Sequence, residues 1–238
     1  MRNTPREFPM QVRFSATPPP PVTASVKRLM FFTWLLSGTF AVGCEPPRPD
    51  SGPDRSSAGI GGTIIDAIPT STETFFPPAA SNSLDLAVIN SVFDHLADIG
   101  DSLNTVGDAG FVPQLATGWK WANDSLSIAF SLNPKARWHD GAPVNAEDVR
   151  FTFKVYSDKR SGSDSPQNVA LIDSVSIRDS LTPVVWFTRR TPHQFFDATY
   201  QMYVLPSHIL GKVALEKMAA DSFSINPVGT GRFRFMRR

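Results

Sequence analysis

The chain of 238 residues has little of several features that would each point to a class of protein. Its single cysteine, Cys44, has no partner for a disulfide within the chain. The formal net charge is only +1, with a basic surplus before Cys44 and a slight acidic surplus after it, so the body offers no basic footprint for nucleic acid. What the chain does have is 41% hydrophobic and 11% aromatic residues, enough for a buried core.

A long hydrophobic run is also lacking. The apolar run Leu29 to Val42 is shorter than the roughly 20 residues that a helix needs to cross a bilayer. A basic dipeptide precedes this run and small residues follow it, which is typical of a secretion signal. We therefore predict that residues 1–43 are a signal peptide with an N-terminal extension.

The end of that signal contains the sequence AVGC, residues 41–44, which resembles the lipobox of bacterial lipoproteins. The resemblance implies that Cys44 is lipidated and becomes the first residue of the mature protein. An ordinary cleaved signal followed by an incidental cysteine stays open as the alternative. Residues 44–60 are mostly Pro, Ser, Gly and charged residues, which cannot bury enough apolar surface to fold, so we predict a flexible tether.

A folded domain is predicted to begin near residue 61, where GGTIIDAIP contains a short β-branched strand. Ser83 is predicted to cap a helix from Leu84 to about Leu96, because apolar residues recur there at helical spacing. Residues 125–132 alternate small with large apolar residues, which predicts a strand with one buried face.

The second half of the domain carries further local signals. Two β-rich runs, around 175–177 and 184–188, flank a polar turn at Asp179 and Ser180 and predict a hairpin. Short helical pieces are expected on either side of Pro206, since proline interrupts a helix. The predicted fold class is therefore mixed α/β.

Residues 137–154 gather aromatic, histidine and acidic side chains as a metal or acid/base site would. However, Asp140 begins a turn, and Asn145 is a good helix N-cap. Glu147 and Asp148 would then lie in the first helical turn, which favours acids. We interpret the stretch as a strand, a turn and a capped helix, with Val149, Phe153 and Tyr156 on one core face.

No sequence pattern indicates catalysis. The chain has no nucleophile elbow, phosphate-binding loop or dinucleotide turn, and its four histidines lack the spacing of metal ligands. We therefore predict no catalytic residue, no metal and no cofactor. A secreted hydrolase remains an alternative class, disfavoured because no nucleophile, base and orienting group can be assigned.

Residues 114–154 resemble the most recognisable block of the bacterial extracellular solute-binding proteins, family 5, the receptors of peptide and nickel ABC importers. The matching positions are Leu115, Ala116, Trp119, Asp124, Trp138, His139, Asp140, Gly141, Pro143, Ala146, Glu147, Asp148 and Val149. The segments VFDHLADIG, YVLPSHIL and NPVGTGRF are similar to further family elements, with Arg232 where proline is usual. The resemblance implies the N-terminal lobe of a type II periplasmic-binding-protein-like fold.

Members of that family are longer and close two lobes over a ligand. With the chain ending at Arg238, the expectation is an incomplete fold, in which residues 61–238 form part of the first lobe and one wall of the cleft. The implied function is an extracytoplasmic, lipid-anchored receptor that binds an oligopeptide or similar small solute and delivers it to an ABC permease. The alternative is a non-binding lipoprotein fragment with a structural or interaction role.

The resemblance also implies a ligand-contacting segment. In such receptors the loop after the first strand meets the ligand, and in this chain that loop contains Thr72, Glu73 and Thr74. The alternative interpretation is a solvated loop of Ser and Thr residues without a binding role.

Overall fold

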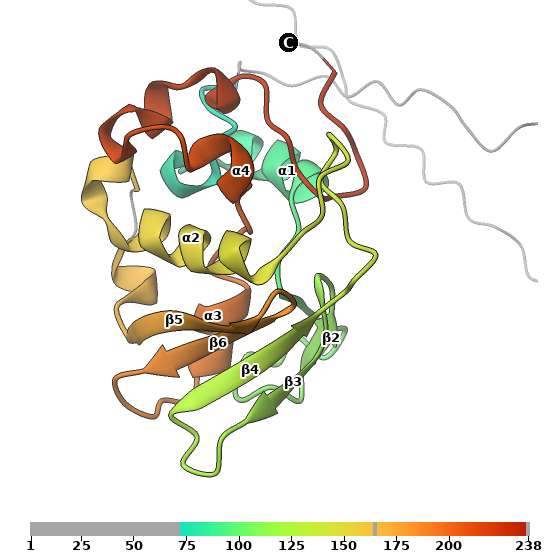
Figure 1. Ribbon diagram of the computed structural model, residues 1–238, viewed down its shortest axis with the longest axis vertical. Helices are drawn as coiled ribbons and strands as arrows, with labels where there is room; N and C mark the ends of the chain where they lie inside the picture. The colour runs from blue at the N-terminus through green and yellow to red at the C-terminus, as the bar shows by residue number, and fades with distance from the viewer. Residues whose placement is uncertain (1–71, 164–165, 237–238) are drawn as a thin grey trace, which may run out of the picture. The chain divides into compact units, whose positions relative to one another are not determined.

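The computed structural model describes residues 72–163 and 166–236 (Figure 1). Contacts divide the chain into Met1–Thr63 and Ile64–Arg238, and all described residues belong to the second unit. The predicted signal peptide, Cys44, the tether and the strand near residue 61 lie outside the described residues. Within the part that is described, no helix is long and apolar enough to cross a membrane.

A four-stranded antiparallel sheet forms the centre of the second unit. Its strands, in spatial order, are β3 (Ala116–Trp121), β4 (Ser127–Leu132), β6 (Thr182–Phe187) and β5 (Ile172–Asp179). The alternation in residues 125–132 is confirmed as a strand, because Ile128, Phe130 and Leu132 are all buried. The predicted hairpin is confirmed as well, with Val175 of β5 paired to Val185 of β6.

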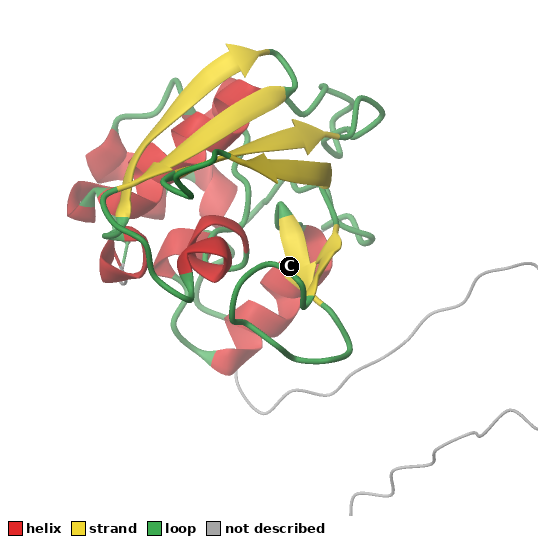
Figure 2. Cartoon of the chain, turned by 90° about the horizontal axis from the view of Figure 1, so that it is seen from below, coloured by secondary structure: helices red, strands yellow, loops and turns green. Residues whose placement is uncertain are grey.

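Helices gather on one side of this sheet (Figure 2). The helices after the hairpin are α3 (Gln194–Thr199) and α4 (Ser207–Leu210), and 3-10 turns occur at Pro77–Ala79, Lys159–Ser161, Pro166–Val169, Leu215–Ala220 and Ser222–Ser224. The predicted interruption at Pro206 is confirmed, since α4 begins at the next residue. Phe195 of α3 is fully buried, and its ring centroid lies 4.7 Å from that of Trp119 on β3. The sheet and α3 thus share one aromatic core.

Helix α2 (Ala146–Ser157) begins with the cap that the sequence predicts. Asn145 Oδ1 accepts hydrogen bonds from the amides of Glu147 at 2.8 Å and Asp148 at 3.3 Å. Asp148 Oδ2 in turn accepts from the Asn145 amide at 2.9 Å, which completes a capping box. The local interpretation of these carboxylates as helix-start residues is confirmed.

The core face of α2 differs slightly from the predicted one. Val149 and Tyr156 are buried as expected, but Phe153 is only half-buried. Phe151 and Val155 are buried instead. Phe151 lines a pocket with residues of α4, and the buried face of α2 is therefore wider than a single stripe through Val149.

Helix α1 (Ser83–Val92) begins one residue before the predicted Leu84, and its cap is a different residue. Asn82 Oδ1 accepts from the Asp85 amide at 2.8 Å, and Ser83 is already helical, so the prediction of Ser83 as N-cap was wrong. Asn is at least as good an N-cap as Ser, and here it stands one position earlier. The helix also ends four residues before the predicted Leu96.

Contacts with distant residues explain the early end of α1. Phe93 is already extended, and the amide of His95 donates to Gln114 Oε1 at 2.7 Å rather than to a helical carbonyl. The chain then forms a two-stranded sheet of β1 (Ala97–Ile99) and β2 (Phe111–Pro113). Leu96 is buried as predicted, but it lies between helix and strand.

Candidate functional site

The segment predicted to meet ligand begins the described residues. Thr72 is buried, Thr74 is half-buried, and Glu73 is exposed. The buried carboxylate of Asp85 on α1 holds this segment, because it accepts the amide of Glu73 at 2.9 Å and that of Thr74 at 3.2 Å. The segment is thus tied to α1, and its contact with a ligand stays a prediction.

The next two amides are also bonded within the chain. The amide of Phe75 donates to the carbonyl of Ser224 at 2.8 Å, and that of Phe76 donates to Thr74 Oγ1 at 3.0 Å. Four successive N–H groups, from Glu73 to Phe76, are therefore occupied. A peptide added along this segment as a strand would need free main-chain donors. Ligand contacts here are limited to carbonyl oxygens and side chains, such as the Glu73 carboxylate.

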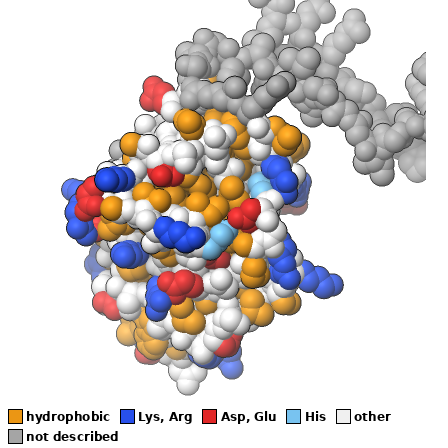
Figure 3. Space-filling model, turned by 45° about the horizontal axis from the view of Figure 1, so that its top comes forward, with side chains coloured by type: hydrophobic (Ala, Val, Ile, Leu, Met, Phe, Trp, Pro, Cys, Tyr) orange, Lys and Arg blue, Asp and Glu red, His pale blue; other side chains and the backbone are white. Residues whose placement is uncertain are grey.

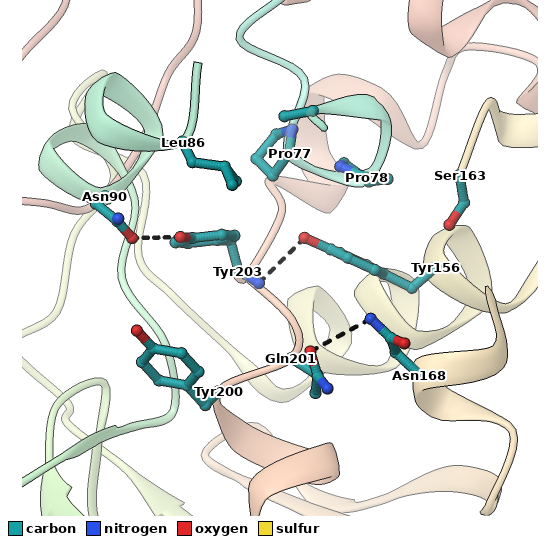
Figure 4. A pocket seen from close by; sticks show the side chains of 11 residues that line it. Pro77, Pro78, Leu86, Asn90, Tyr156, Ser163, Asn168, Tyr200, Gln201 and Tyr203 are labelled. Atoms are coloured by element: carbon teal, nitrogen blue, oxygen red, sulfur yellow. Dashed lines mark hydrogen bonds between the residues drawn. The ribbon is translucent and has the colours of Figure 1, made fainter. Parts of the chain in front are cut away.

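A cavity of about 320 Å³ lies directly after this segment, with Pro77 and Pro78 in its wall (Figure 4). Its volume is at the lower end of the roughly 300–1,000 Å³ of small-molecule pockets. The chain has three tyrosines, and all three, Tyr156, Tyr200 and Tyr203, line this cavity. We call it the tyrosine cavity.

Polar groups from separate elements meet around the tyrosine cavity (Figure 4). The amide of Tyr203 donates to Tyr156 Oη at 3.2 Å, and Tyr203 Oη donates to Asn90 Oδ1 of α1. Asn168 Nδ2 donates to Gln201 Oε1 at 3.3 Å. Hydroxyl and carboxamide groups that are far apart in sequence thus converge on one space.

The described residues that line the tyrosine cavity are all uncharged. No Asp, Glu, Lys, Arg or His side chain is among the described residues that line it. Burial raises the pKa of Tyr156 and the pKa of Tyr203, so both hydroxyls stay protonated at neutral pH. The Ser163 hydroxyl, 8% exposed, has no hydrogen-bond partner in the described part of the chain. The described part of the wall therefore offers hydrogen bonds without charge.

His95 packs behind two of these tyrosines. Its ring centroid lies 4.6 Å from that of Tyr200 and 4.1 Å from that of Tyr203, and its Nδ1 lies 3.2 Å from the Met202 carbonyl oxygen. Burial lowers the pKa of His95 to about 4, so the ring is neutral at pH 7. It supports the tyrosines by packing and adds no charge to the wall.

The charged side chains of the described residues lie outside the lining of the tyrosine cavity. On the face in Figure 3 acidic and basic side chains are interspersed. At the surface Glu147 pairs with Arg150, and His208 Nε2 lies 2.7 Å from Asp140 Oδ2. Over residues 72–163 and 166–236, no group of three or more His, Cys, Asp or Glu side chains could hold a metal ion.

His139 connects two of the motifs that carry the family resemblance. Its amide donates to the Gly229 carbonyl at 2.8 Å, and its Nε2 lies 2.9 Å from the Gly231 carbonyl oxygen. The turn around Asp140 and the glycine-containing loop therefore meet in the fold. His139 holds that loop in place, which is a structural role.

Sequence reasoning missed the tyrosine cavity. Tyr156 follows the core periodicity of α2, and Tyr200 and Tyr203 lie in a segment that shows only weak helical signals. The one available signal was scarcity, because the chain has only three tyrosines and two of them stand within four residues. Scarcity alone does not indicate where side chains meet.

The comparisons with known proteins agree on one family. Residues 110–238 match the family model described as bacterial extracellular solute-binding proteins, family 5, middle. A Brucella ovis protein whose name assigns it to peptide binding for an ABC transporter is 32% identical over 163 residues. The aligned residues are 68% of this chain and 29% of that relative.

Two solved structures extend the likeness to the fold. NikZ of Campylobacter jejuni, in complex with Ni(L-His), is 30% identical with a TM-score of 0.58, over 68% of this chain and 30% of that one. AppA of Bacillus subtilis, in complex with a nonapeptide, is 21% identical with a TM-score of 0.64. The match covers 70% of this chain and 32% of AppA. The mixed α/β, periplasmic-binding-protein-like fold is confirmed. This chain spans about 30% of the length of the relatives it matches.

Proposed function

Because the chain belongs to the bacterial extracellular solute-binding proteins, family 5, we propose that it forms part of the solute-binding wall of an ABC importer's receptor. Proteins of this family are extracytoplasmic solute receptors rather than enzymes. The receptor captures an oligopeptide or a similar small solute and presents it to a permease. The receptor binds and releases its solute without chemical change, so it needs no catalytic side chains.

The observation that carries this proposal is the tyrosine cavity and its place in the chain. The predicted ligand segment, Thr72 to Thr74, leads within three residues to Pro77 in the cavity wall. Aromatic faces and a few convergent polar groups are typical of small-molecule sites. A charged acid/base pair, which hydrolysis would require, is lacking among the described lining residues.

The relatives' ligands narrow the class of solute. The NikZ structure contains a nickel complex of histidine, and the AppA structure contains a nonapeptide. Both ligands contain amino-acid units. This common chemistry favours a peptide or an amino-acid derivative as the solute of this chain.

We also propose that Cys44 carries lipid and anchors the receptor to a membrane. The support is the sequence alone, where a basic dipeptide, a short apolar run and small residues precede the only cysteine. The tether of residues 44–60 would then hold the folded unit at the membrane surface, within reach of the permease.

The solute-binding proposal is tested by recording amide resonances of the 15N-labelled full chain while trialanine is added. Binding in the millimolar range is expected, because the cavity is small and solvent reaches part of its wall. We expect saturable shifts at the amides of Gln201 and Tyr203. The amide of Arg178, an exposed residue on strand β5 that does not line the cavity, serves as the internal control.

Two results would contradict the proposal. Unchanged amide resonances up to about 10 mM trialanine, well above a millimolar Kd, would favour the non-binding structural alternative. Cleavage of the peptide, detected by mass spectrometry of the same sample, would favour an enzyme.

A further inference from the structure

Resting on the proposed function, we infer that the tyrosine cavity selects an uncharged hydrogen-bonding side chain of the solute, a carboxamide or hydroxyl, with Ser163 Oγ as its partner. The proposal concerns which group enters the cavity. It starts from the one side-chain polar atom, among the described lining residues, that is buried and unbonded.

Ser163 is buried, with 8% of its surface exposed. Its hydroxyl has no hydrogen-bond partner among the described residues. Figure 4 shows the hydroxyl oxygen on the side of the residue that faces Tyr156 and Asn168. Buried polar groups in folded proteins nearly always have a hydrogen-bond partner, because losing water without one is costly. A solute group in the cavity supplies the missing partner.

The neighbouring carboxamides define what that group must offer. The single bond between Asn168 and Gln201 uses one N–H and one oxygen. Each carboxamide has two N–H donors and an acceptor oxygen, so the pair still presents the unbonded Asn168 oxygen and three N–H donors. Ser163 can both donate and accept. A solute group that also does both, such as a carboxamide or a hydroxyl, matches this set.

Charged groups are disfavoured at the same place. An ammonium or carboxylate that entered the cavity would lose water without meeting an opposite charge, since the described lining residues are all neutral. Tyr156 Oη can still donate its proton, and Tyr203 Oη, which donates to Asn90, can still accept a hydrogen bond, but neither hydroxyl can neutralise a full charge.

Apolar groups are disfavoured for a different reason. Methyl and methylene groups would fit against the faces of Tyr200 and Tyr203, yet they would leave the Ser163 hydroxyl buried and unpaired. Sites with buried polar groups discriminate strongly against analogues that cannot bond to them. The cavity thus discriminates on two properties, charge and hydrogen-bonding capacity.

The test uses three tripeptides whose central residues have similar length. Ala-Gln-Ala is neutral and bonds through a carboxamide, Ala-Glu-Ala has nearly the same shape with a charge, and Ala-Met-Ala has neither property. Dissociation constants are measured with the full chain by amide-resonance titration. We expect Ala-Gln-Ala to bind at least about fivefold more tightly than either of the others, the effect of one hydrogen bond.

Two variants identify the partner. Ser163→Ala is expected to weaken Ala-Gln-Ala about fivefold, to the level of Ala-Met-Ala. It should leave the midpoint of thermal unfolding unchanged or slightly raised, because it removes an unpaired hydroxyl. The matched control is Ser174→Ala, whose exposed hydroxyl on β5 contacts Asp173, and it should leave all three dissociation constants unchanged.

The outcomes separate this inference from the proposed function. Equal binding of the three peptides overturns the inference but not the proposed receptor function. A preference for Ala-Gln-Ala that is unchanged in Ser163→Ala has the same consequence. Binding of none of the peptides overturns both. A lower unfolding midpoint of Ser163→Ala, together with unchanged binding, shows that the hydroxyl is bonded within the protein and also overturns the inference.

Discussion

The indole Nε1 of Trp138 donates a hydrogen bond to Asp148 Oδ2 at 3.2 Å, and both side chains are almost fully buried. The same carboxylate accepts the Asn145 amide at 2.9 Å, the Ser207 amide at 2.9 Å and Ser207 Oγ at 2.6 Å. Asp148 therefore joins the turn before α2, the start of α2 and the start of α4. These four bonds account for its burial without a role in chemistry.

Replacing Asp148 by Ala should lower the free energy of unfolding by about 3–5 kcal/mol, because the buried indole of Trp138 and the half-buried donors of Ser207 lose their acceptor. An acid that acted only at the helix N-terminus would cost about 1 kcal/mol. Glu147→Ala is the matched control, since Glu147 is an exposed acid one residue earlier. Urea unfolding at pH 7 measures the loss of unfolding free energy in both variants. Equal losses below about 1 kcal/mol would show that the long-range bonds of Asp148 contribute little.

Asp85 should anchor the predicted ligand segment. Asp85→Ala removes the acceptor of the Glu73 and Thr74 amides, so we expect those two amides to exchange with solvent much faster. The free energy of unfolding should fall by about 2–4 kcal/mol. Glu73→Ala, at an exposed side chain, should change it by less than about 0.5 kcal/mol. Unaltered exchange at residues 73 and 74 in Asp85→Ala would disprove the anchoring role.

His95 should make stability depend on pH in a defined window. Burial lowers the pKa of His95 from 6.5 to about 4, so between these values the unfolded chain binds the proton and the folded chain does not. The stability from His95 is thus fully present above pH 6.5 and is lost as pH falls towards 4. The loss should reach about 3 kcal/mol.

The pH effect is measured as the difference in unfolding free energy between the wild type and His95→Phe at a series of pH values. The carboxyl groups common to both chains cancel in this difference. His193→Phe, at an exposed histidine, is the control for replacing an imidazole ring by a phenyl ring. A difference that stays constant from pH 7 to 4 would show that His95 titrates normally in the folded chain.

Cys44→Ser should release the protein from membranes, because it removes the thiol to which lipid would be attached. Fractionation of expressing cells, with mass spectrometry of the mature N-terminus, measures the effect. The lipid anchor is wrong if the variant remains with the membrane fraction and the wild-type terminus carries no added lipid mass.

Features that depend on a few neighbouring residues could be predicted from the sequence. The alternation in residues 125–132 predicts β4, and Asn145 predicts the start of α2, because each signal is contained within one element. The wall of the tyrosine cavity, in contrast, is formed by residues that are distant in the sequence. The Tyr203 amide reaches Tyr156 Oη across 47 residues, and no local pattern encodes that contact.

Local patterns were incomplete at two further points for the same reason. Helical spacing continues to Leu96, but α1 ends at Val92 because the amide of His95 bonds to Gln114, 19 residues away. Asp148 was interpreted from its own helix, whereas its bonds to Ser207 span 59 residues. Tertiary contacts therefore override the local helical preference at these positions.

The central claim, that the tyrosine cavity binds solute, is tested most directly by replacing tyrosine with 3-fluorotyrosine throughout the chain. All three tyrosines line the cavity, so each 19F resonance reports on the candidate site and on nothing else. Single Tyr→Phe variants assign the resonances. Adding Ala-Gln-Ala should shift the resonances of Tyr200 and Tyr203 in a saturable manner, with a Kd in the millimolar range. If all three resonances stay unchanged up to about 10 mM peptide, far above that Kd, the cavity is not a solute-binding site.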